Sequence, residues 1–163
     1  MNASILRFLS AVAIIAVTLP TSADANAPAG QYVVTAGGTG NGTVYDTKSK
    51  LTWQQTVSST TFTWADAKTH CAGAGASLGG SGWRLPTIKE LVTIVDLSQA
   101  TAPMIDPNAF PGTPAARFWS SSPVAGSPSY AWHVLFGNGY SFSASDVSSM
   151  CNVRCVTATV TSR

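Results

Sequence analysis

A periodic run of apolar residues predicts a helix beginning near residue 88. The apolar positions recur at the i, i+3, i+4 and i+7 spacing of a helix that lies on a core; they are Ile88, Leu91, Val92 and Val95. Thr87 stands three residues before Glu90, which is the capping-box arrangement that starts such a helix. The pattern therefore predicts a capped amphipathic helix after Thr87.

A second capping pattern predicts an earlier helix. Thr63 stands three residues before Asp66, with Asp in place of the usual Glu. A helix starting there carries Trp64, Ala67 and Cys71 on one face. The Gly-rich segment 72–82 then links the two helices.

Strand patterns flank these helices. Residues 43–46 and 51–54 surround the polar turn 47–50 and predict a hairpin, preceded by a short strand at 31–34. After a proline-rich middle segment, further strands are expected at 118–120, 130–136, 140–142 and 152–156, and residues 121–129 are expected to form a loop. This order predicts an α+β fold of two helices packed on a small twisted antiparallel sheet with long loops.

Composition narrows the function classes. Only 10% of the 163 residues are charged, against about 25% in ordinary soluble domains, and the net charge is +2. Nucleic-acid binders show a basic stripe, so a nucleic-acid partner is not expected. The apolar fraction of 45% is sufficient for a core, and the length fits one domain.

The N-terminus has the features of an export signal. Arg7 precedes an apolar run at 8–19, and Ala23-Asp24-Ala25 supplies the small residues that a signal peptidase requires. A membrane anchor is the alternative, but the run is shorter than the roughly 20 residues of a membrane span. We expect cleavage after Ala25 and a secreted or periplasmic protein without a membrane span. Residues 26–42 then form an extension with the first strand.

The three cysteines allow one disulfide. If Cys151 and Cys155 lie on one extended strand, their Cα atoms are about 13 Å apart, which is too far for a bond. Cys71 is therefore expected to pair with one of the two.

The ordered motifs resemble a known family. They begin with Val44-Tyr45-Asp46 and Leu51-Thr52-Trp53-Gln54, and the most specific is Trp83-Arg84-Leu85-Pro86-Thr87-Ile88-Lys89-Glu90-Leu91; Phe118-Trp119-Ser120-Ser121, Ala131-Trp132-His133-Val134 and Val153-Arg154-Cys155-Val156 follow. Over residues 43–157 the chain resembles the Lcl C-terminal domain family of bacterial collagen-like adhesins, long catalogued as a domain of unknown function. Residues 158–163 are a tail. No collagen-like repeat precedes the domain in this sequence, so the avidity that a collagen trimer would supply is not expected.

The resemblance implies a C-type-lectin-like fold, shared with formylglycine-generating enzymes, and a surface or secreted binding module. The best-known setting of the family is attachment to sulfated or acidic glycans. Cys155 occupies the position of the family's structural cysteine, which implies a Cys71–Cys155 disulfide with Cys151 free. Structural roles are expected for the tryptophans and charged residues of the motifs, namely Trp53, Trp64, Trp83, Arg84, Glu90, Trp119, Trp132 and Arg154.

The lectin-like fold implies a ligand face built from loops near the C-terminus. These correspond to 121–129, the turn at 138–140, and 143–149, and the candidate ligand-binding residues are Ser122, Ser127, Tyr130, Asn138, Tyr140, Ser143 and Asp146. The three segments contain no Lys or Arg, which a highly sulfated glycan would require. We therefore expect a neutral glycan or a protein as the ligand.

Metal and cofactor sites are weakly indicated. His70 and His133 have no second ligand at metal spacing, so no metal or catalytic role is expected. Asp106-Pro107-Asn108 offers oxygen ligands for calcium but lacks the dense acidic run of calcium sites. No cofactor is expected.

Two alternatives to a non-catalytic binding module remain open. One is a structural protein of the bacterial envelope or of an assembly. The other is a copper oxidase like the formylglycine-generating enzymes, in which Cys151 and Cys155 would be the paired thiolates.

Overall fold

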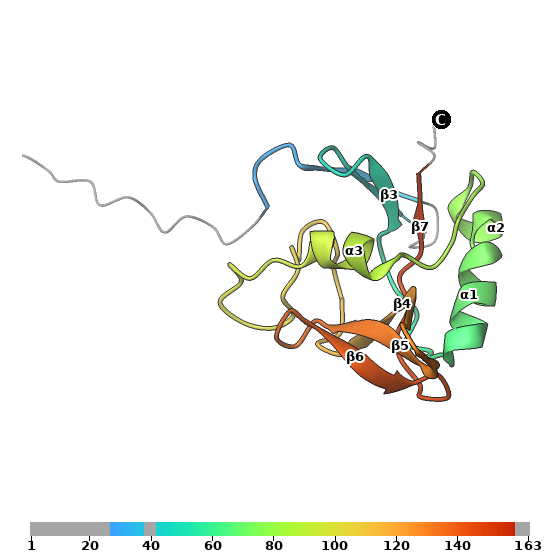
Figure 1. Ribbon diagram of the computed structural model, residues 1–163. Helices are drawn as coiled ribbons and strands as arrows, with labels where there is room; N and C mark the ends of the chain where they lie inside the picture. Colours follow the sequence, from blue (N-terminus) through green and yellow to red (C-terminus); the bar gives the residue numbers. More distant parts are fainter. Residues whose placement is uncertain (1–26, 38–41, 159–163) are drawn as a thin grey trace, which may run out of the picture.

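The computed structural model describes residues 27–37 and 42–158 and has an α+β architecture with two small antiparallel sheets (Figure 1). The first sheet has the strand order β1-β2-β3-β7, and its strands are β1 (Tyr32–Thr35), β2 (Thr43–Asp46), β3 (Leu51–Gln54) and β7 (Val156–Thr157). The hairpin predicted at 43–54 is confirmed, with Thr43 opposite Gln54 and Asp46 opposite Leu51.

The second sheet has the order β4-β5-β6 and consists of β4 (Arg117–Val124), β5 (Ser127–Leu135) and β6 (Tyr140–Asp146). Two predictions are corrected here. One sheet was expected and two are present, and the expected loop 121–129 is a hairpin that turns at Ala125-Gly126. Gly126 adopts φ +72°, a conformation that lets the chain reverse tightly at low steric cost.

Helix α1 (Trp64–Ala72) begins at the predicted cap, where Thr63 Oγ1 accepts the backbone N–H of Asp66. A single-turn helix, α2 (Gly75–Leu78), lies within the segment that was expected to be a plain link. Helix α3 (Ile88–Leu91) has the predicted capping box, but it is only four residues long and continues as a 3₁₀ turn at Val92–Ile94. The predicted longer helix through Val95 is therefore wrong. Its last four residues, Val92, Thr93, Ile94 and Val95, are all β-branched, and β-branched residues lower helix propensity.

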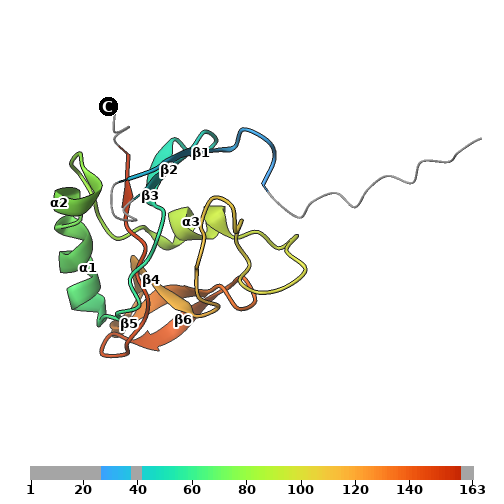
Figure 2. The same ribbon diagram turned by 180° about the vertical axis from the view of Figure 1, so that it is seen from behind.

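Two clusters of buried residues hold these elements together. Figure 2 shows α3 between the two sheets, with α1 and α2 on one flank. The first cluster joins both sheets to α3 through residues such as Trp53, Leu91, Phe118 and Phe136. The second packs α1 against the second sheet and includes Trp83, Trp119 and all three cysteines. The domain therefore depends on contacts between segments far apart in sequence.

The disulfide joins Cys71 in α1 to Cys155, with a Cα–Cα distance of 5.3 Å, and Cys151 is a buried free thiol. This confirms the pairing implied by the family resemblance. The strand expected at 152–156 is mostly absent, because only Val156 and Thr157 pair with β3. Residues 151–155 instead run between the sheets, with an isolated bridge from Asn152 to Phe118 of β4.

Arg154 is fully buried in this crossing segment. Its guanidinium donates to the carbonyl oxygens of Gln54 and Gln55 at 2.7 and 2.6 Å and to Thr113 Oγ1 at 2.7 Å, and it lies 4.6 Å from the ring centre of Phe110. These contacts tie the crossing segment to the end of β3 and to Thr113.

The tryptophans differ in burial. Trp53, Trp83 and Trp119 are buried, as expected of core residues. Trp64 and Trp132 are only half-buried, and Trp64 packs against the second cluster from its edge. Trp64 Nε1 donates to the Ser120 carbonyl oxygen, and the Lys68 ammonium lies 3.5 Å from the Trp64 ring centre.

Among the helices of the described ranges, none combines the length and apolar character that a membrane crossing requires.

Candidate ligand-binding site

Helix α3 is held in place by charge and hydrogen bonds. Arg84 donates to both carboxylate oxygens of Glu90, at 2.6 and 2.8 Å, and the same carboxylate accepts the N–H and hydroxyl of Thr87. The N–H of Ile88 donates to Ser122 Oγ on β4 at 3.0 Å. These contacts fix the start of α3 against the second sheet.

This arrangement predicts acid sensitivity. The hydrogen bonds from Arg84, followed by those from Thr87, lower the pKa of Glu90 to about 2, against desolvation that raises it. Because the folded-state pKa is depressed, the carboxylate stabilises the fold above its ordinary pKa, and this stabilisation is lost as the pH falls from about 4.5 toward 2. We expect Glu90→Gln to cost about 1 kcal/mol at pH 7 and less at pH 2, as measured by urea unfolding at both pH values. An equal cost at both would contradict the assignment.

A shallow groove runs between α3 and the second sheet. It has a volume of about 220 Å³ and is lined by Ile88, Lys89, Val92, Trp132 and Ser141. We call it the α3 groove. Its walls come from α3 and the 3₁₀ turn on one side and from β5 and β6 on the other.

Strand pairing explains why these residues meet. Ser141 lies opposite Val134, and Trp132 is two residues before Val134, so Trp132 and Ser141 are diagonal neighbours on one sheet face. The Ser120 hydroxyl donates to the Trp132 carbonyl oxygen at 2.7 Å, which fixes β5 to β4 beneath the groove. The backbone that carries the half-buried Trp132 indole therefore lies between β4 and β6.

The lining chemistry suits binding. An indole face offers an apolar, electron-rich surface, and the Lys89 ammonium and Ser141 hydroxyl are donors beside it. Such a set can stack on one face of a ring and hydrogen-bond to its substituents.

Two of the predicted ligand-binding residues lie close to this groove. Asn138 and Tyr140 are exposed in the turn that leads into Ser141, and Asn138 Oδ1 accepts the backbone N–H of Tyr140. Gly139 packs so closely on Leu97 that a Cβ at this position would lie 2.5 Å from the leucine Cδ2. The turn is thus seated against the segment that follows α3.

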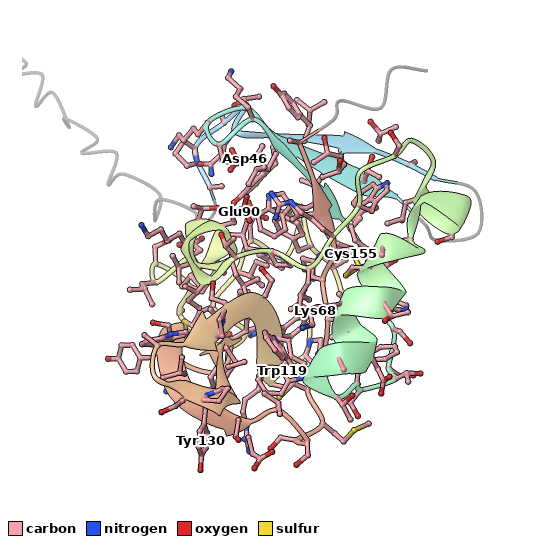
Figure 3. All side chains as sticks on the ribbon, turned by 45° about the vertical axis from the view of Figure 1, so that its right-hand side comes forward. Asp46, Lys68, Glu90, Trp119, Tyr130 and Cys155 are labelled. Carbon is pink, nitrogen blue, oxygen red and sulfur yellow. A yellow bond between two sulfur atoms is a disulfide. The ribbon has the colours of Figure 1, made fainter. Side chains whose placement is uncertain are left out.

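Three other predicted residues lie at the opposite end of the sheet. Tyr130 pairs with Asp146, whereas Leu135 pairs with Tyr140, so five residues of β5, or about 17 Å, separate the two ends. Figure 3 shows Tyr130 at the rim of the sheet. Ser127 lies at the β4–β5 turn, at the same end as Tyr130. The residues that were expected to form one ligand face therefore lie in two separate areas of the sheet.

The remaining two predicted residues contribute differently. The Ser122 hydroxyl accepts the Ile88 N–H, which gives it a role in seating α3. Ser143 is in β6, but its side chain lies outside the described residues.

Sequence reasoning missed the groove itself. The sequence pattern places Ile88 and Val92 on the core face of a helix and gives Trp132 a structural role, and it does not bring these residues together. One sequence feature pointed toward the groove. Trp132 lies in a segment that alternates like a strand, so it shares a sheet face with every second residue, and its burial depends on what covers that face.

The other candidate sites have structural explanations. Asp106 Oδ1 accepts the N–H groups of Asn108 and Ala109, so the carboxylate organises its own turn. In the described ranges no group of three or more His, Cys, Asp or Glu side chains is placed to hold a metal. His70 stacks on Phe62 at 4.5 Å, and burial lowers the pKa of His133, whose ring packs against Trp119.

Comparison with known proteins identifies the family. Residues 42–157 match the Lcl C-terminal domain, and the chain belongs to this family. No curated protein matched the sequence.

Proposed function

We propose that the chain is an exported, non-catalytic recognition module that binds a glycan in the α3 groove. The observation that carries this proposal is that the half-buried Trp132 lines the groove together with Lys89 and Ser141. A tryptophan costs little side-chain entropy when it holds a ligand, because it has two rotatable χ angles.

The electrostatics favour a neutral or weakly acidic glycan. Lys89 is the one cationic side chain among the groove-lining residues. A heavily sulfated chain would require several cations, whereas one ammonium can donate to hydroxyl groups or pair with a single carboxylate.

The export part of this proposal is supported by the sequence, through the apolar run at 8–19 and the small residues before position 26. The non-catalytic part is supported by the cysteine chemistry. Cys155 is bonded to Cys71, so the Cys151–Cys155 thiolate pair of a copper oxidase is not available in this oxidised form.

The test is a glycan array followed by titration of the best binder. We expect Trp132→Ala to weaken binding at least tenfold, since the indole supplies the stacking surface. Tyr130→Ala is the matched control, because it removes an exposed aromatic side chain from the other end of the same sheet. Its affinity should stay within about twofold of wild type.

If Tyr130→Ala weakens binding and Trp132→Ala leaves the affinity unchanged, the binding site lies at the Tyr130 end of the sheet instead. A blank array together with a co-purifying envelope protein would favour the structural alternative instead.

A further inference from the structure

One wall of the α3 groove is apolar and remains partly exposed. Val92 is 39% exposed and Ile88 is half-buried, whereas Leu91 and Ile94 of the same segment are buried in the first cluster. Figure 1 shows α3 next to the sheet that contains β5 and β6, and this sheet forms the other wall. The groove therefore has two aliphatic side chains on one side and the Trp132 indole on the other.

The polar groups of the groove-lining side chains are mostly hydrogen-bond donors. The Lys89 ammonium and the Trp132 indole N–H donate and cannot accept, whereas the Ser141 hydroxyl can do both. Lys89 is exposed, and the ion pair found among the described residues joins Arg84 to Glu90, so no described carboxylate pairs with this ammonium. A ligand that matches this set must supply acceptors.

The volume of the groove limits the size of its ligand. At about 220 Å³ it is smaller than the pockets of roughly 300–1,000 Å³ that take drug-sized molecules. The groove therefore has room for one sugar ring with a small substituent, and a longer glycan would extend out of it.

We propose that the α3 groove selects an N-acetylated hexosamine, with the acetamide methyl against Ile88 and Val92 and the sugar ring on Trp132. In this arrangement the acetamide carbonyl oxygen accepts a hydrogen bond from Lys89 or Ser141. This inference rests on the glycan-binding function proposed above and names the class of sugar that the groove recognises.

The acetamide group matches both features of the groove. Its methyl is apolar, as the exposed wall of α3 is, and its carbonyl oxygen is an acceptor for side chains that donate. A plain hexose has no methyl, so it would place hydroxyl groups or water against Val92. A 6-deoxy sugar has a methyl but no carbonyl, so it would leave the donors without this acceptor.

The experiment titrates protein exported from the full-length gene with N-acetylglucosamine, glucose and 6-deoxyglucose, and follows the protein N–H signals by NMR. Burial of one methyl group gives about fourfold in affinity and one hydrogen bond a further few-fold, so N-acetylglucosamine should bind about tenfold more tightly than glucose. The affinity of 6-deoxyglucose should be about threefold or more below that of N-acetylglucosamine, because the carbonyl is missing. Saturation transfer from the protein should be strongest at the acetyl methyl protons.

Val92→Thr tests where the methyl lies. Thr has nearly the shape of Val but places a hydroxyl in the apolar wall, so the preference for N-acetylglucosamine over glucose should fall about threefold or more. Val33→Thr is the matched control, because Val33 is 50% exposed on β1 of the other sheet and does not line the groove. Its preference should equal that of the wild type, and thermal melts of both variants verify that they are folded.

The outcomes separate this inference from the glycan proposal. Equal affinities for N-acetylglucosamine and glucose would overturn the inference alone, as would 6-deoxyglucose binding as tightly as N-acetylglucosamine. A preference that Val92→Thr leaves intact would show that the methyl does not lie on the α3 wall, and the inference would again fail. If none of the three sugars shifts a signal from a groove residue, the inference is wrong, and the glycan proposal fails with it when the glycan array is also blank.

Discussion

Loss of the Cys71–Cys155 disulfide should lower the free energy of unfolding by about 4–5 kcal/mol. The bond closes a loop with a sequence separation of 84 residues, and the chain-entropy account gives this magnitude for such a loop. It also ties α1 to the segment that enters β7, so its loss frees a helix from the sheet region it packs on. Urea unfolding of the Cys71→Ala/Cys155→Ala double variant measures the effect.

Cys151→Ala is the matched control for this experiment. Cys151 is buried in the same cluster but carries no bond, so its replacement should cost about 1 kcal/mol for the lost sulfur. If the double variant costs no more than Cys151→Ala, the disulfide contributes packing and no chain constraint.

Sequence predicted the parts of the fold that obey local rules. The 43–54 hairpin and both helix starts follow from a turn between alternating strands and from Thr side chains three residues before an acid. The disulfide partner came from the family resemblance, because spacing alone left Cys151 and Cys155 open.

The errors arose where tertiary pairing decides the structure. Segment 121–129 is rich in Ser and Pro and has the composition of a loop, yet β4 and β5 extend into it. The Ser121 N–H donates to the Pro86 carbonyl oxygen and the Ser120 hydroxyl donates to the Trp132 carbonyl oxygen, so distant backbone satisfies these polar groups. Pro123 lies at a register shift, where its missing N–H is tolerated.

The α3 groove was hidden for a related reason. Trp132 would be a core residue if the helix after Thr87 ran on across the sheet. Because α-helical geometry ends at Leu91 and the chain tightens into a 3₁₀ turn, Val92 and Trp132 remain partly exposed on either side of the groove. A helix boundary of this kind depends on packing that a periodic pattern does not contain.

Trp83→Ala should destabilise the domain by about 3–5 kcal/mol. The indole is buried with Leu85 and both disulfide cysteines in the second cluster, and its Nε1 donates to the Gly79 carbonyl oxygen at 2.7 Å. Truncation leaves a large cavity and an unpaired carbonyl. For a small domain this is a large share of the total stability, so we expect partial or complete unfolding at 37 °C in a thermal melt.

Tyr140→Ala provides the contrast. Tyr140 is 62% exposed at the end of the sheet near the α3 groove, so its removal should cost less than about 1 kcal/mol. If the groove binds a glycan, the loss of this neighbouring aromatic surface should weaken binding less than Trp132→Ala does, because Trp132 lines the groove directly. If Trp83→Ala melts like the wild type while Tyr140→Ala unfolds, the assignment of Trp83 to the core and of Tyr140 to the surface is wrong. If Tyr140→Ala melts like the wild type but loses as much affinity as Trp132→Ala does, the binding surface extends onto the 138–140 turn.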